Sequence, residues 1–299
     1  MLRSLEEVFE LAKNKKCKRL AVVAAHDPET IKAVVKAKRE GLISPILIGK
    51  EEEIEHLLDY QNESPKDYEI IHLPDNNEAA KRAVELVKEN KVDCLMKGHL
   101  DTAEIIRAVV NKDTGIAVDS VVSHVNIMEL EKYPKLVVLT DVAINIAPTF
   151  EEKQVILANA VKVLKALNYD MPKVAAVCAI EKVNPKMLET VEANQLKEMN
   201  QQGLIKDCII EGPISFDIAM DTGRSERKHF KGNIQGDADI LLMPNLLAGN
   251  LLSKGLGIFG NGIGIGIVMG AQVPVILSSR GALADIKYQS ILGCLAILD

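Results

Sequence analysis

Two hydroxyls, a guanidinium and a carboxylate follow one another near the C-terminus of this 299-residue chain. The apolar, β-branched run 273–277 predicts a buried strand, and Ser278, Ser279 and Arg280 come directly after it. An arginine at this place presents a planar fork of donors that matches phosphate oxygens, and a neighbouring hydroxyl can donate to an oxyanion. Asp285, early in the next helix, can accept a proton. The pattern predicts a site for an anion, and the alternative is a turn in which Arg280 and Asp285 form a surface ion pair.

Arg107 and His99 are the next candidates for binding an anion. Arg107 lies in the second turn of a helix that Asp101 is expected to begin, and the alternative is that it faces solvent. His99 follows Lys97-Gly98 at the end of another predicted strand, where it binds a substrate or is a plain turn residue. His124, in Val-Ser-His-Val, is expected to be a core or strand residue. The histidines lack the spacing of metal ligands, and we predict no metal site; they are His26, His56, His72, His99, His124 and His229.

The elements that hold these residues alternate between short apolar runs and longer amphipathic ones. Helix starts are marked by an N-cap side chain before proline, in Asp27-Pro28 and Asn184-Pro185, and by capping boxes over 101–104 and 149–152. The expected strands are Leu20–Ala25, Pro45–Ile48, Glu69–His72, Val92–Met96, Leu136–Thr140, Val174–Ile180, Cys208–Glu211, Ile240–Met243 and Val273–Leu277.

Strand–helix alternation predicts an α/β protein with βαβ units and mostly parallel sheets. In such sheets, ligands bind beyond the carboxyl ends of the strands. We therefore expect a cleft for a charged small molecule, because the strand ends are polar and carry both signs of charge. These ends are Ala25-His26-Asp27, Lys97-Gly98-His99, Thr140-Asp141, Glu181-Lys182, Glu211-Gly212-Pro213, Pro244-Asn245 and Ser278-Ser279-Arg280.

Composition excludes several classes of protein. The net charge of −6 does not favour nucleic acid, which needs a basic surface. No apolar run approaches the roughly 20 residues that span a bilayer, and Glu6 and Glu7 interrupt any signal peptide, so we expect a cytoplasmic protein without a membrane partner. The five cysteines have no CxxC spacing and are expected to be reduced; of these, Cys94, Cys178, Cys208 and Cys294 are expected to be buried.

One glycine pattern, Gly255-Leu-Gly257-Ile-Phe-Gly260, matches the GxGxxG dinucleotide fingerprint. The fingerprint requires a strand before its first glycine, whereas the run 251–254 resembles a helix end, so a tight turn with close helix packing is the favoured interpretation. Arg280 lies twenty residues past Gly260, where an NADP-binding protein could use an arginine, and that alternative stays open. The serine hydrolase pattern GxSxG and the phosphate loop GxxxxGK[ST] are absent from the sequence.

Further stretches share their order and spacing with a known family over almost the whole chain. The matching stretches are Lys97-Gly98-His99, Thr102, Arg107, Ser123-His124-Val125, Thr140-Asp141, Asn145-Ile146-Ala147-Pro148, Pro172-Lys173-Val174-Ala175, Glu181 to Met187, Glu211-Gly212-Pro213, Asp217, Gly236 to Leu241, Pro244, Gly249-Asn250, Val273-Pro274-Val275 and Ser279-Arg280. Through them the sequence resembles the phosphate acetyl/butyryltransferase family. The butyryl branch is the most similar, since the chain is shorter before Val92 and lacks the extra arginine that acetyl-specific members carry there.

The resemblance implies two α/β/α domains with mostly parallel sheets and an active site in the cleft between them, akin to isocitrate and isopropylmalate dehydrogenases. One domain takes both the N-terminal part and the C-terminal strand and helix. We expect domain I to comprise residues 1–118 and 271–299, and domain II to comprise residues 119–270.

The resemblance also implies a reaction in which acyl-CoA and orthophosphate give acyl phosphate and CoA, reversibly and in one ternary complex. CoA is then a substrate or product, and no tightly bound cofactor, metal or covalent intermediate is expected. Arg280 and Arg107 hold the phosphate, Ser279 binds the oxyanion or the thiolate, and Asp285 exchanges the thiol proton. Asp285 and Arg107 match the family only across small gaps. The expected substrate-binding residues are His99, Gly249, Asn250 and Ser278.

Other functions stay open at this point. Phosphate acetyltransferase is the alternative within the family. An NAD(P)-dependent decarboxylating dehydrogenase on the same fold needs a cluster of aspartates, for which Asp217 and Asp221 are the candidates. A sensor would bind CoA or acyl phosphate without turnover. We expect a homo-oligomer, a dimer or larger, because the apolar, glycine-rich segment 255–270 would favour aggregation if it were exposed.

Overall fold

The computed structural model describes residues 2–279 and 281–299. This part of the chain divides into two compact units. Unit 1 comprises residues 2–5 and 123–264, and unit 2 comprises residues 6–122 and 265–299. The sequence-based boundaries are 118/119 and 270/271, whereas the units divide at 122/123 and 264/265. Unit 2 therefore combines two segments that are distant in sequence.

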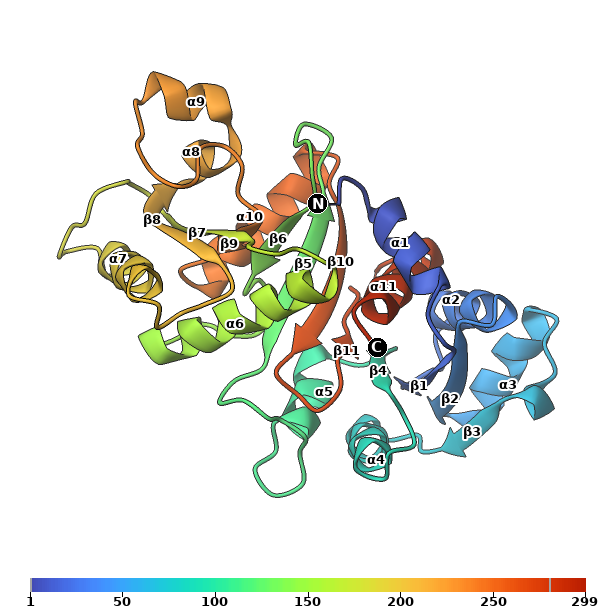
Figure 1. The fold of residues 1–299 in the computed structure, drawn as a ribbon. Coiled ribbons are helices and arrows are strands. Elements are labelled where there is room, and N and C mark those ends of the chain that lie inside the picture. Colours follow the sequence, from blue (N-terminus) through green and yellow to red (C-terminus); the bar gives the residue numbers. More distant parts are fainter. Residues whose placement is uncertain (1, 280) are drawn as a thin grey trace. The chain divides into compact units, whose positions relative to one another are not determined.

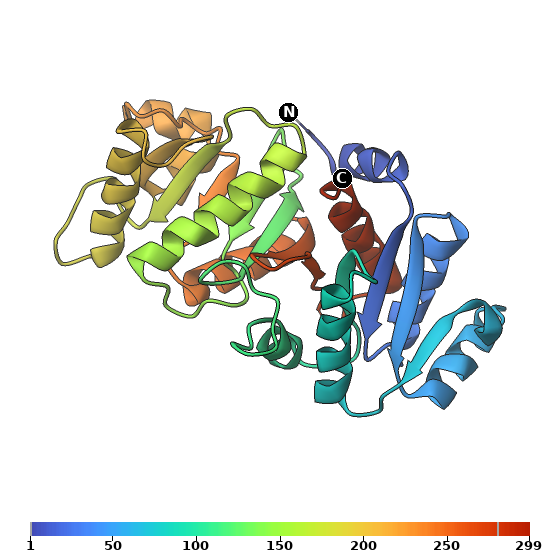
Figure 2. The same cartoon turned by 60° about the horizontal axis from the view of Figure 1, so that its bottom comes forward.

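Unit 2 is built on a sheet with the strand order β3-β2-β1-β4-β11-β10. The strands from β3 to β11 run parallel, and β10 is antiparallel to β11. Helices α2, α3 and α11 cover one face and helices α4 and α5 the other (Figures 1 and 2). The strands are β1 (Lys18–Val23), β2 (Ile43–Gly49), β3 (Glu69–His72), β4 (Cys94–Lys97), β10 (Ile263–Met269) and β11 (Val275–Ile276). The helices are α1 (Leu5–Lys13), α2 (Pro28–Arg39), α3 (Glu51–Tyr60), the 3-10 turn η1 (Pro65–Asp67), α4 (Asn76–Lys88), α5 (Thr102–Val109) and α11 (Ala284–Ala296).

Unit 1 has the strand order β5-β6-β9-β7-β8. Its strands run parallel except β5, which is antiparallel to β6. Helices α6 and α7 pack on one face, and α8 and α10 pack against the core of the other (Figure 1). The strands are β5 (Ser123–Glu129), β6 (Val137–Thr140), β7 (Lys173–Cys178), β8 (Ile209–Ser215) and β9 (Ile240–Leu242). The helices are α6 (Phe150–Ala166), α7 (Leu188–Gln201), α8 (Phe216–Met220), α9 (Thr222–Arg227) and α10 (Leu246–Phe259).

The predicted α/β class with a mostly parallel sheet is confirmed. Each of the nine expected strands overlaps a strand of the structure, and β3 has the predicted bounds. Two strands, β5 and β10, lie outside the expected set. Both take part in antiparallel pairs, and both lack the continuous apolar run of a buried parallel strand, since β5 contains His124 and Asn126 and β10 begins Ile-Gly-Ile-Gly.

The predicted helix starts are confirmed in three of four places. Asp27 accepts the Thr30 N–H at 2.9 Å and caps α2. Capping boxes begin α5 and α6. The start at Asn184-Pro185 is wrong, because α7 begins at Leu188. The Asn184 side chain instead accepts the Lys186 N–H at 3.0 Å and closes a turn before the helix.

The glycine pattern 255–260 lies in and just after α10, which runs to Phe259. A helix therefore surrounds the first glycines, where the dinucleotide fingerprint needs a strand and a turn. The expected helix end at 251–254 is too early by more than one turn. The geometry does not support dinucleotide binding at this segment.

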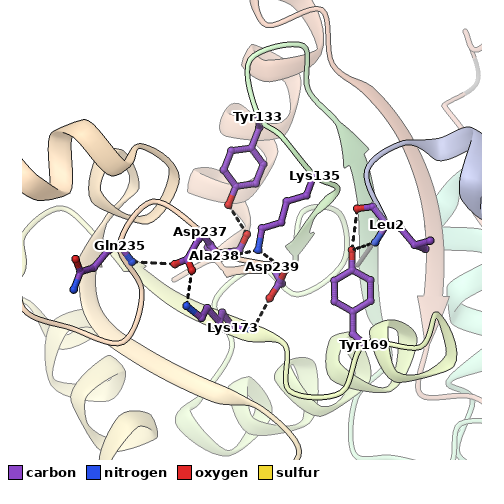
Figure 3. A network of polar contacts seen from close by, with 9 residues as sticks. All are labelled: Leu2, Tyr133, Lys135, Tyr169, Lys173, Gln235, Asp237, Ala238 and Asp239. Atoms are coloured by element: carbon purple, nitrogen blue, oxygen red, sulfur yellow. Dashed lines mark hydrogen bonds and ion pairs between the residues drawn. The ribbon is translucent and has the colours of Figure 1, made fainter.

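A polar network joins the amino ends of the unit 1 strands (Figure 3). Lys135, just before β6, is buried and donates to the Asp239 carboxylate at 2.5 Å and to the Asp237 carbonyl at 2.7 Å. The Asp239 carboxylate also accepts the backbone N–H of Lys173, the first residue of β7, at 2.8 Å. Buried polar groups are tolerated when each finds a partner, and these contacts fix β6, β7 and β9 at the edge opposite their carboxyl ends.

The cysteines expected to be core residues are buried. Cys94, Cys178, Cys208 and Cys294 have no disulfide, and Cys17 is exposed. Burial raises the pKa of the Cys178 thiol to about 12 and that of Cys208 to about 11, so both stay protonated at neutral pH. Within the described residues, no helix combines the length and the apolar character that crossing a bilayer requires.

Candidate active site

Three of the expected polar strand ends lie at one edge of the unit 2 sheet. In the register, Val23 of β1 pairs with Lys97 of β4, and Met96 of β4 pairs with Ile276 of β11. Continuing this register places residues 97–99 between residues 23–25 and residues 277–279. Because the strands are parallel, their carboxyl ends open on the same side, where α/β proteins bind ligands.

Gly98 allows the first two of these strand ends to approach closely. Its N–H donates to the Val23 carbonyl at 2.8 Å, and the His99 N–H donates to the Ala24 carbonyl at 2.8 Å. A Cβ atom on Gly98 would lie 2.3 Å from the Ala24 carbonyl oxygen, a distance that no side chain tolerates. The glycine of Lys97-Gly98-His99 therefore holds His99 at the edge. Lys97 is buried beneath it, and its Nζ donates to the Leu100 carbonyl at 2.9 Å.

Ser278 and Ser279 occupy the end of β11 and differ in exposure. Ser278 is 8% exposed, and its Oγ has no hydrogen-bond partner among residues 2–279 and 281–299. Ser279 is exposed, and its carbonyl accepts the Ala282 N–H at 3.0 Å, which turns the chain toward α11. A buried hydroxyl without a partner costs free energy and calls for a functional explanation. Arg280, the predicted phosphate-binding residue, lies outside the described residues.

His99 has a histidine neighbour that the sequence candidates do not include. The imidazole of His26, three residues beyond the paired end of β1, has its ring centroid 6.0 Å from that of His99. His99 is exposed and His26 is half-buried. From the sequence, His26 is expected only as one of the polar residues at strand ends. Its position directly after the first parallel strand is the signal that could identify it as a site residue.

Arg107 projects from α5, the helix that follows β4. The Glu104 carboxylate accepts the Asp101 N–H at 2.6 Å and fixes the first turn of the helix. Ile105 and Val109 form the buried side of α5, and Arg107 is exposed. No described residue forms an ion pair or hydrogen bond with its guanidinium, so the charge is available to a ligand.

Asp285 lies in the first turn of α11 and faces α2. Its carboxylate is 3.9 Å from the Lys36 ammonium, and the side chain is 83% exposed. It borders a groove of about 870 Å³ that residues of α1, α2 and α11 line, among them Lys13 and Tyr288. In the described residues Asp285 makes no contact with Ser278 or Ser279. The carboxylate that the structure places near the edge is Asp27, which caps α2 and pairs with the buried Lys287 at 3.4 Å.

Gly249 and Asn250 lie in unit 1, on α10, where they pack the helix against the segment after β6. A Cβ on Gly249 would lie 2.4 Å from the Asp141 carbonyl oxygen. The Asn250 amide donates to the Val142 carbonyl at 3.0 Å. These contacts give both residues a structural role. A further role in binding substrate stays a prediction.

His124 is buried in β5, beside Asp141. The His124 N–H donates to the Asp141 carboxylate at 3.2 Å, and the Thr140 hydroxyl donates to the His124 carbonyl at 2.9 Å. Asp141 also accepts the N–H groups of Ala143 at 2.7 Å and Ile144 at 2.9 Å. Burial lowers the pKa of His124, and its Nδ1 has no partner. The histidine is therefore buried in the core and neutral at pH 7.

Asp217 and Asp221, the candidates for a dehydrogenase metal site, have structural partners. Asp217 forms an ion pair with Lys228 at 3.1 Å, and Asp221 accepts the Arg224 N–H at 2.8 Å and caps α9. Among the described residues, no three histidine, cysteine, aspartate or glutamate side chains are grouped closely enough to hold a metal ion.

The sequence matches one protein family over most of its length. The model of the Phosphate acetyl/butaryl transferase family matches residues 68–294. The chain is 39% identical to the phosphate butyryltransferase of Clostridium acetobutylicum, over 97% of each protein. It is 36% identical to the phosphate acetyltransferase of Thermotoga maritima, over 96% of this chain and 97% of that protein.

Solved structures give the same answer. A branched-chain phosphotransacylase from Enterococcus faecalis is 29% identical, with a TM-score of 0.81 over 94% of this chain and 98% of the other. A 4-hydroxythreonine-4-phosphate dehydrogenase from Klebsiella pneumoniae is 14% identical with a TM-score of 0.57, a likeness of fold alone. The fold and the family match define an acyltransferase. The chain belongs to the phosphate acetyl/butyryltransferase family, as the sequence resemblance predicts.

Proposed function

We propose that this acyltransferase is a phosphate butyryltransferase, which transfers a butyryl group between CoA and orthophosphate. The observation that carries the proposal is the end-to-end match with the Clostridium acetobutylicum enzyme, 39% identical over 97% of both proteins. Acetyl transfer is the alternative within the family, since the Thermotoga maritima acetyltransferase matches almost equally well. A cytoplasmic location, a homo-oligomer and the absence of a tightly bound cofactor belong to the same proposal.

The proposed chemistry is direct transfer in a ternary complex. A phosphate oxygen attacks the thioester carbonyl carbon, a C–O bond forms, the C–S bond breaks, and CoA leaves as a thiolate that takes up a proton. The reactants are anionic, so the protein must position them and stabilise their charge. Arg280 and Arg107 hold the phosphate, and Ser279 donates to the oxyanion. The exposed Arg107, which has no partner among the described residues, supports this assignment.

Asp285 is the proposed acceptor of the CoA thiol proton when acyl phosphate is converted to thioester. A thiol with a pKa near ~8.5 is mostly protonated at neutral pH, so a base accelerates this direction. In the structure, the Asp285 carboxylate lies 3.9 Å from the Lys36 ammonium, on the side of α11 that faces α2.

Ser278 and His99 complete the proposed substrate site in unit 2. The Ser278 hydroxyl is buried without a partner, and His99 is exposed at the neighbouring strand end. Both sit at the carboxyl edge, and both can donate to a phosphoryl oxygen. The proposed contribution of Gly249 and Asn250 to the pantetheine path, and the expected domain arrangement akin to isocitrate dehydrogenases, stay predictions.

The decisive experiment measures thiol release from acetyl-, butyryl- and branched acyl-CoA, with and without orthophosphate. We expect phosphate-dependent release with butyryl-CoA as the preferred substrate. A preference for acetyl-CoA would select the alternative within the family. If calorimetry detects CoA binding but no thioester releases a thiol, the protein is a CoA sensor and the proposed transferase activity is rejected.

A further inference from the structure

His26 carries an unusual pair of ring nitrogens at the carboxyl edge of unit 2. Its Nδ1 is buried and has no hydrogen-bond partner in the described part of the chain. The ring lies against Gly49, where a Cβ atom would come within 2.8 Å of that nitrogen. Nε2 is not among the buried unpartnered atoms, and the residue as a whole is half-buried. One edge of the imidazole is therefore closed by protein, and the other reaches solvent.

The backbone around His26 holds the ring in this position. Ala24, two residues before it, has a φ of 54°, in the left-handed region that residues other than glycine rarely adopt. Ala24 is fully buried, and its carbonyl accepts the His99 N–H at 2.8 Å. The Ala25 N–H donates to the Ile48 carbonyl at 2.9 Å. Such conformations persist only where the surrounding structure enforces them, and they cluster at functional sites.

This arrangement selects one tautomer of the imidazole. A proton on Nδ1 would be a buried donor without an acceptor, at a cost of about 1–3 kcal/mol. The proton is therefore on Nε2, and His26 presents a neutral N–H donor toward solvent. Charging the ring would place the second proton on the buried nitrogen. Burial accordingly lowers the pKa of His26, although Glu53 acts in the opposite direction.

The groups around this donor suit a phosphoryl ligand. His99 lies beside it, with a centroid separation of 6.0 Å. Strand β4 lies between β1 and β11, which places these two strands about 10 Å apart at a strand spacing of about 4.8 Å. The hydroxyl of Ser278, just after β11, is also buried and has no partner among the described residues. Charged groups that act on His26 from neighbouring elements are Lys50, Glu53 and Asp27. The Nε2–H of His26 and the hydroxyl of Ser278 are therefore two donors at one carboxyl edge with no partner among the described residues, and they suit a ligand with several acceptor oxygens.

We propose that His26 donates its Nε2–H to a phosphoryl oxygen of the substrate bound at this edge, an inference that rests on the proposed phosphate acyltransferase function. His26 then acts as a substrate-binding residue beside His99 and Ser278. Because His26 is neutral at pH 7, the positive charge that balances the phosphoryl group comes from the arginines. The phosphoryl oxygen belongs either to orthophosphate and acyl phosphate or to CoA.

The test compares His26→Gln with His26→Ala. The Gln amide can place an N–H where Nε2 lies, whereas Ala removes the donor. A neutral hydrogen bond contributes about 0.5–1.5 kcal/mol, so we expect His26→Ala to raise one KM by roughly 3- to 10-fold with little change in kcat. His26→Gln should stay within about 2-fold of the wild type. His56→Gln, an exposed histidine on α3, is the matched control, and a thermal melt checks that each variant is folded.

The separate Michaelis constants identify the source of the oxygen. A rise confined to orthophosphate assigns the donor to that substrate, and a rise confined to acyl-CoA assigns it to the CoA phosphates. Unchanged constants in a folded His26→Ala protein, or equal losses in the Gln and Ala variants, would overturn the inference.

A binding experiment separates this inference from the proposed function. In the wild-type protein, the imidazole ¹⁵N resonances of His26 should report the Nε2–H tautomer and shift on addition of orthophosphate or CoA. Such a shift in a protein without transferase activity would retain the binding role and reject the function. Transferase activity with no shift and no change in KM would retain the function and reject the binding role.

Discussion

Ser278 and Ser123 are both serines buried at strand ends, and they differ in what their hydroxyls contact. The Ser123 Oγ accepts a hydrogen bond from the Asn159 amide at 2.9 Å, whereas no described residue is a partner for the Ser278 Oγ. Replacing Ser278 by Ala removes an unsatisfied polar group, so the free energy of unfolding should stay the same or rise. If the hydroxyl holds substrate, kcat/KM should nevertheless fall by roughly 10-fold, the effect of one lost hydrogen bond. Urea unfolding and thiol-release kinetics on the same preparation measure the two effects.

The Ser123→Ala protein is the matched control for this prediction. It should lose about 1 kcal/mol of stability, because the Asn159 amide is left without its acceptor. A Ser278→Ala protein with wild-type kinetics would remove this hydroxyl from the substrate site. The comparison of the two variants thus distinguishes a serine hydroxyl that stabilises the fold from one that binds a ligand.

The effect of replacing Arg280 is a further prediction at the scale of single residues. Removing one preorganised charge-stabilising donor typically costs 10²–10³-fold in turnover, so Arg280→Ala should lower kcat by roughly that factor. The circular dichroism spectrum and melting temperature should not change. Arg82→Ala is the control, since that arginine pairs with Glu85 and Glu89 on the outer face of α4. Full butyryl transfer by the Arg280→Ala protein would leave phosphate binding to other residues.

The site residues differ in how well the sequence could predict them. Ser278 and His99 follow apolar runs, and the rule that parallel strands open on one edge brings their strand ends together. His26 obeys the same rule, but its significance depends on Gly49, which is distant in sequence and closes one side of its ring. Asn250 contacts the Val142 carbonyl across more than a hundred residues. Contacts of this kind arise from tertiary packing, which no local pattern encodes.

At the scale of elements, the sequence was most informative where an element is locally consistent. The strand Glu69–His72 and the capping boxes over 101–104 and 149–152 are short-range signals, and the structure contains all of them. Strand β10 was outside the predicted set because its glycines interrupt the apolar pattern. Its burial depends on the neighbouring strand β11, with which Ile267 and Val268 pair. Antiparallel pairing of this kind is decided by tertiary contacts.

The junction of α2 and α11 makes a prediction at this scale. Asp27 caps α2 and also lies 3.4 Å from the Lys287 ammonium of α11, which is 1% exposed. Asp27→Asn keeps an N-cap side chain but leaves a buried cation without its partner. Breaking a buried pair in this way costs about 3–5 kcal/mol, measurable by urea unfolding at pH 7. The double variant Asp27→Asn with Lys287→Met should recover much of the loss.

The Asp27 carboxylate also makes the stability difference between the wild type and Asp27→Asn depend on pH. Burial alone would raise the pKa of Asp27, but the Thr30 hydrogen bonds and the Lys287 charge lower it below its usual value. A carboxyl group with a lowered pKa contributes stability above its unfolded pKa of about 3.9, and loses it as pH falls through the folded pKa. The wild type and Asp27→Asn should therefore converge in stability below about pH 4. A constant difference down to pH 2 would exclude ionisation of Asp27 as the cause.

At the scale of the whole molecule, helix α10 exposes several large apolar side chains. Leu247, Leu251, Ile258 and Phe259 are exposed, Phe259 to 89%, and Lys254 is the only charged residue of the helix. The first three recur at helical spacing and form one stripe. Lys254 lies within that stripe, seven residues after Leu247 and four before Ile258, and Gly255 lies beside the stripe, where a Cβ would meet nothing within 4 Å. Contiguous apolar surface of this kind marks an interaction site when it reaches a few hundred Å².

We predict that a second copy of the chain covers this stripe. In an isologous dimer the same patch meets itself. Leu251→Glu places a carboxylate in that contact on both copies, so we expect the mass from light scattering to fall to that of a single chain. Tyr60→Glu, on an exposed aromatic of α3 in unit 2, should leave the mass unchanged. A wild-type protein that is monomeric at micromolar concentration would contradict the predicted oligomer. A Leu251→Glu protein of unchanged mass would place the oligomer contact on another surface.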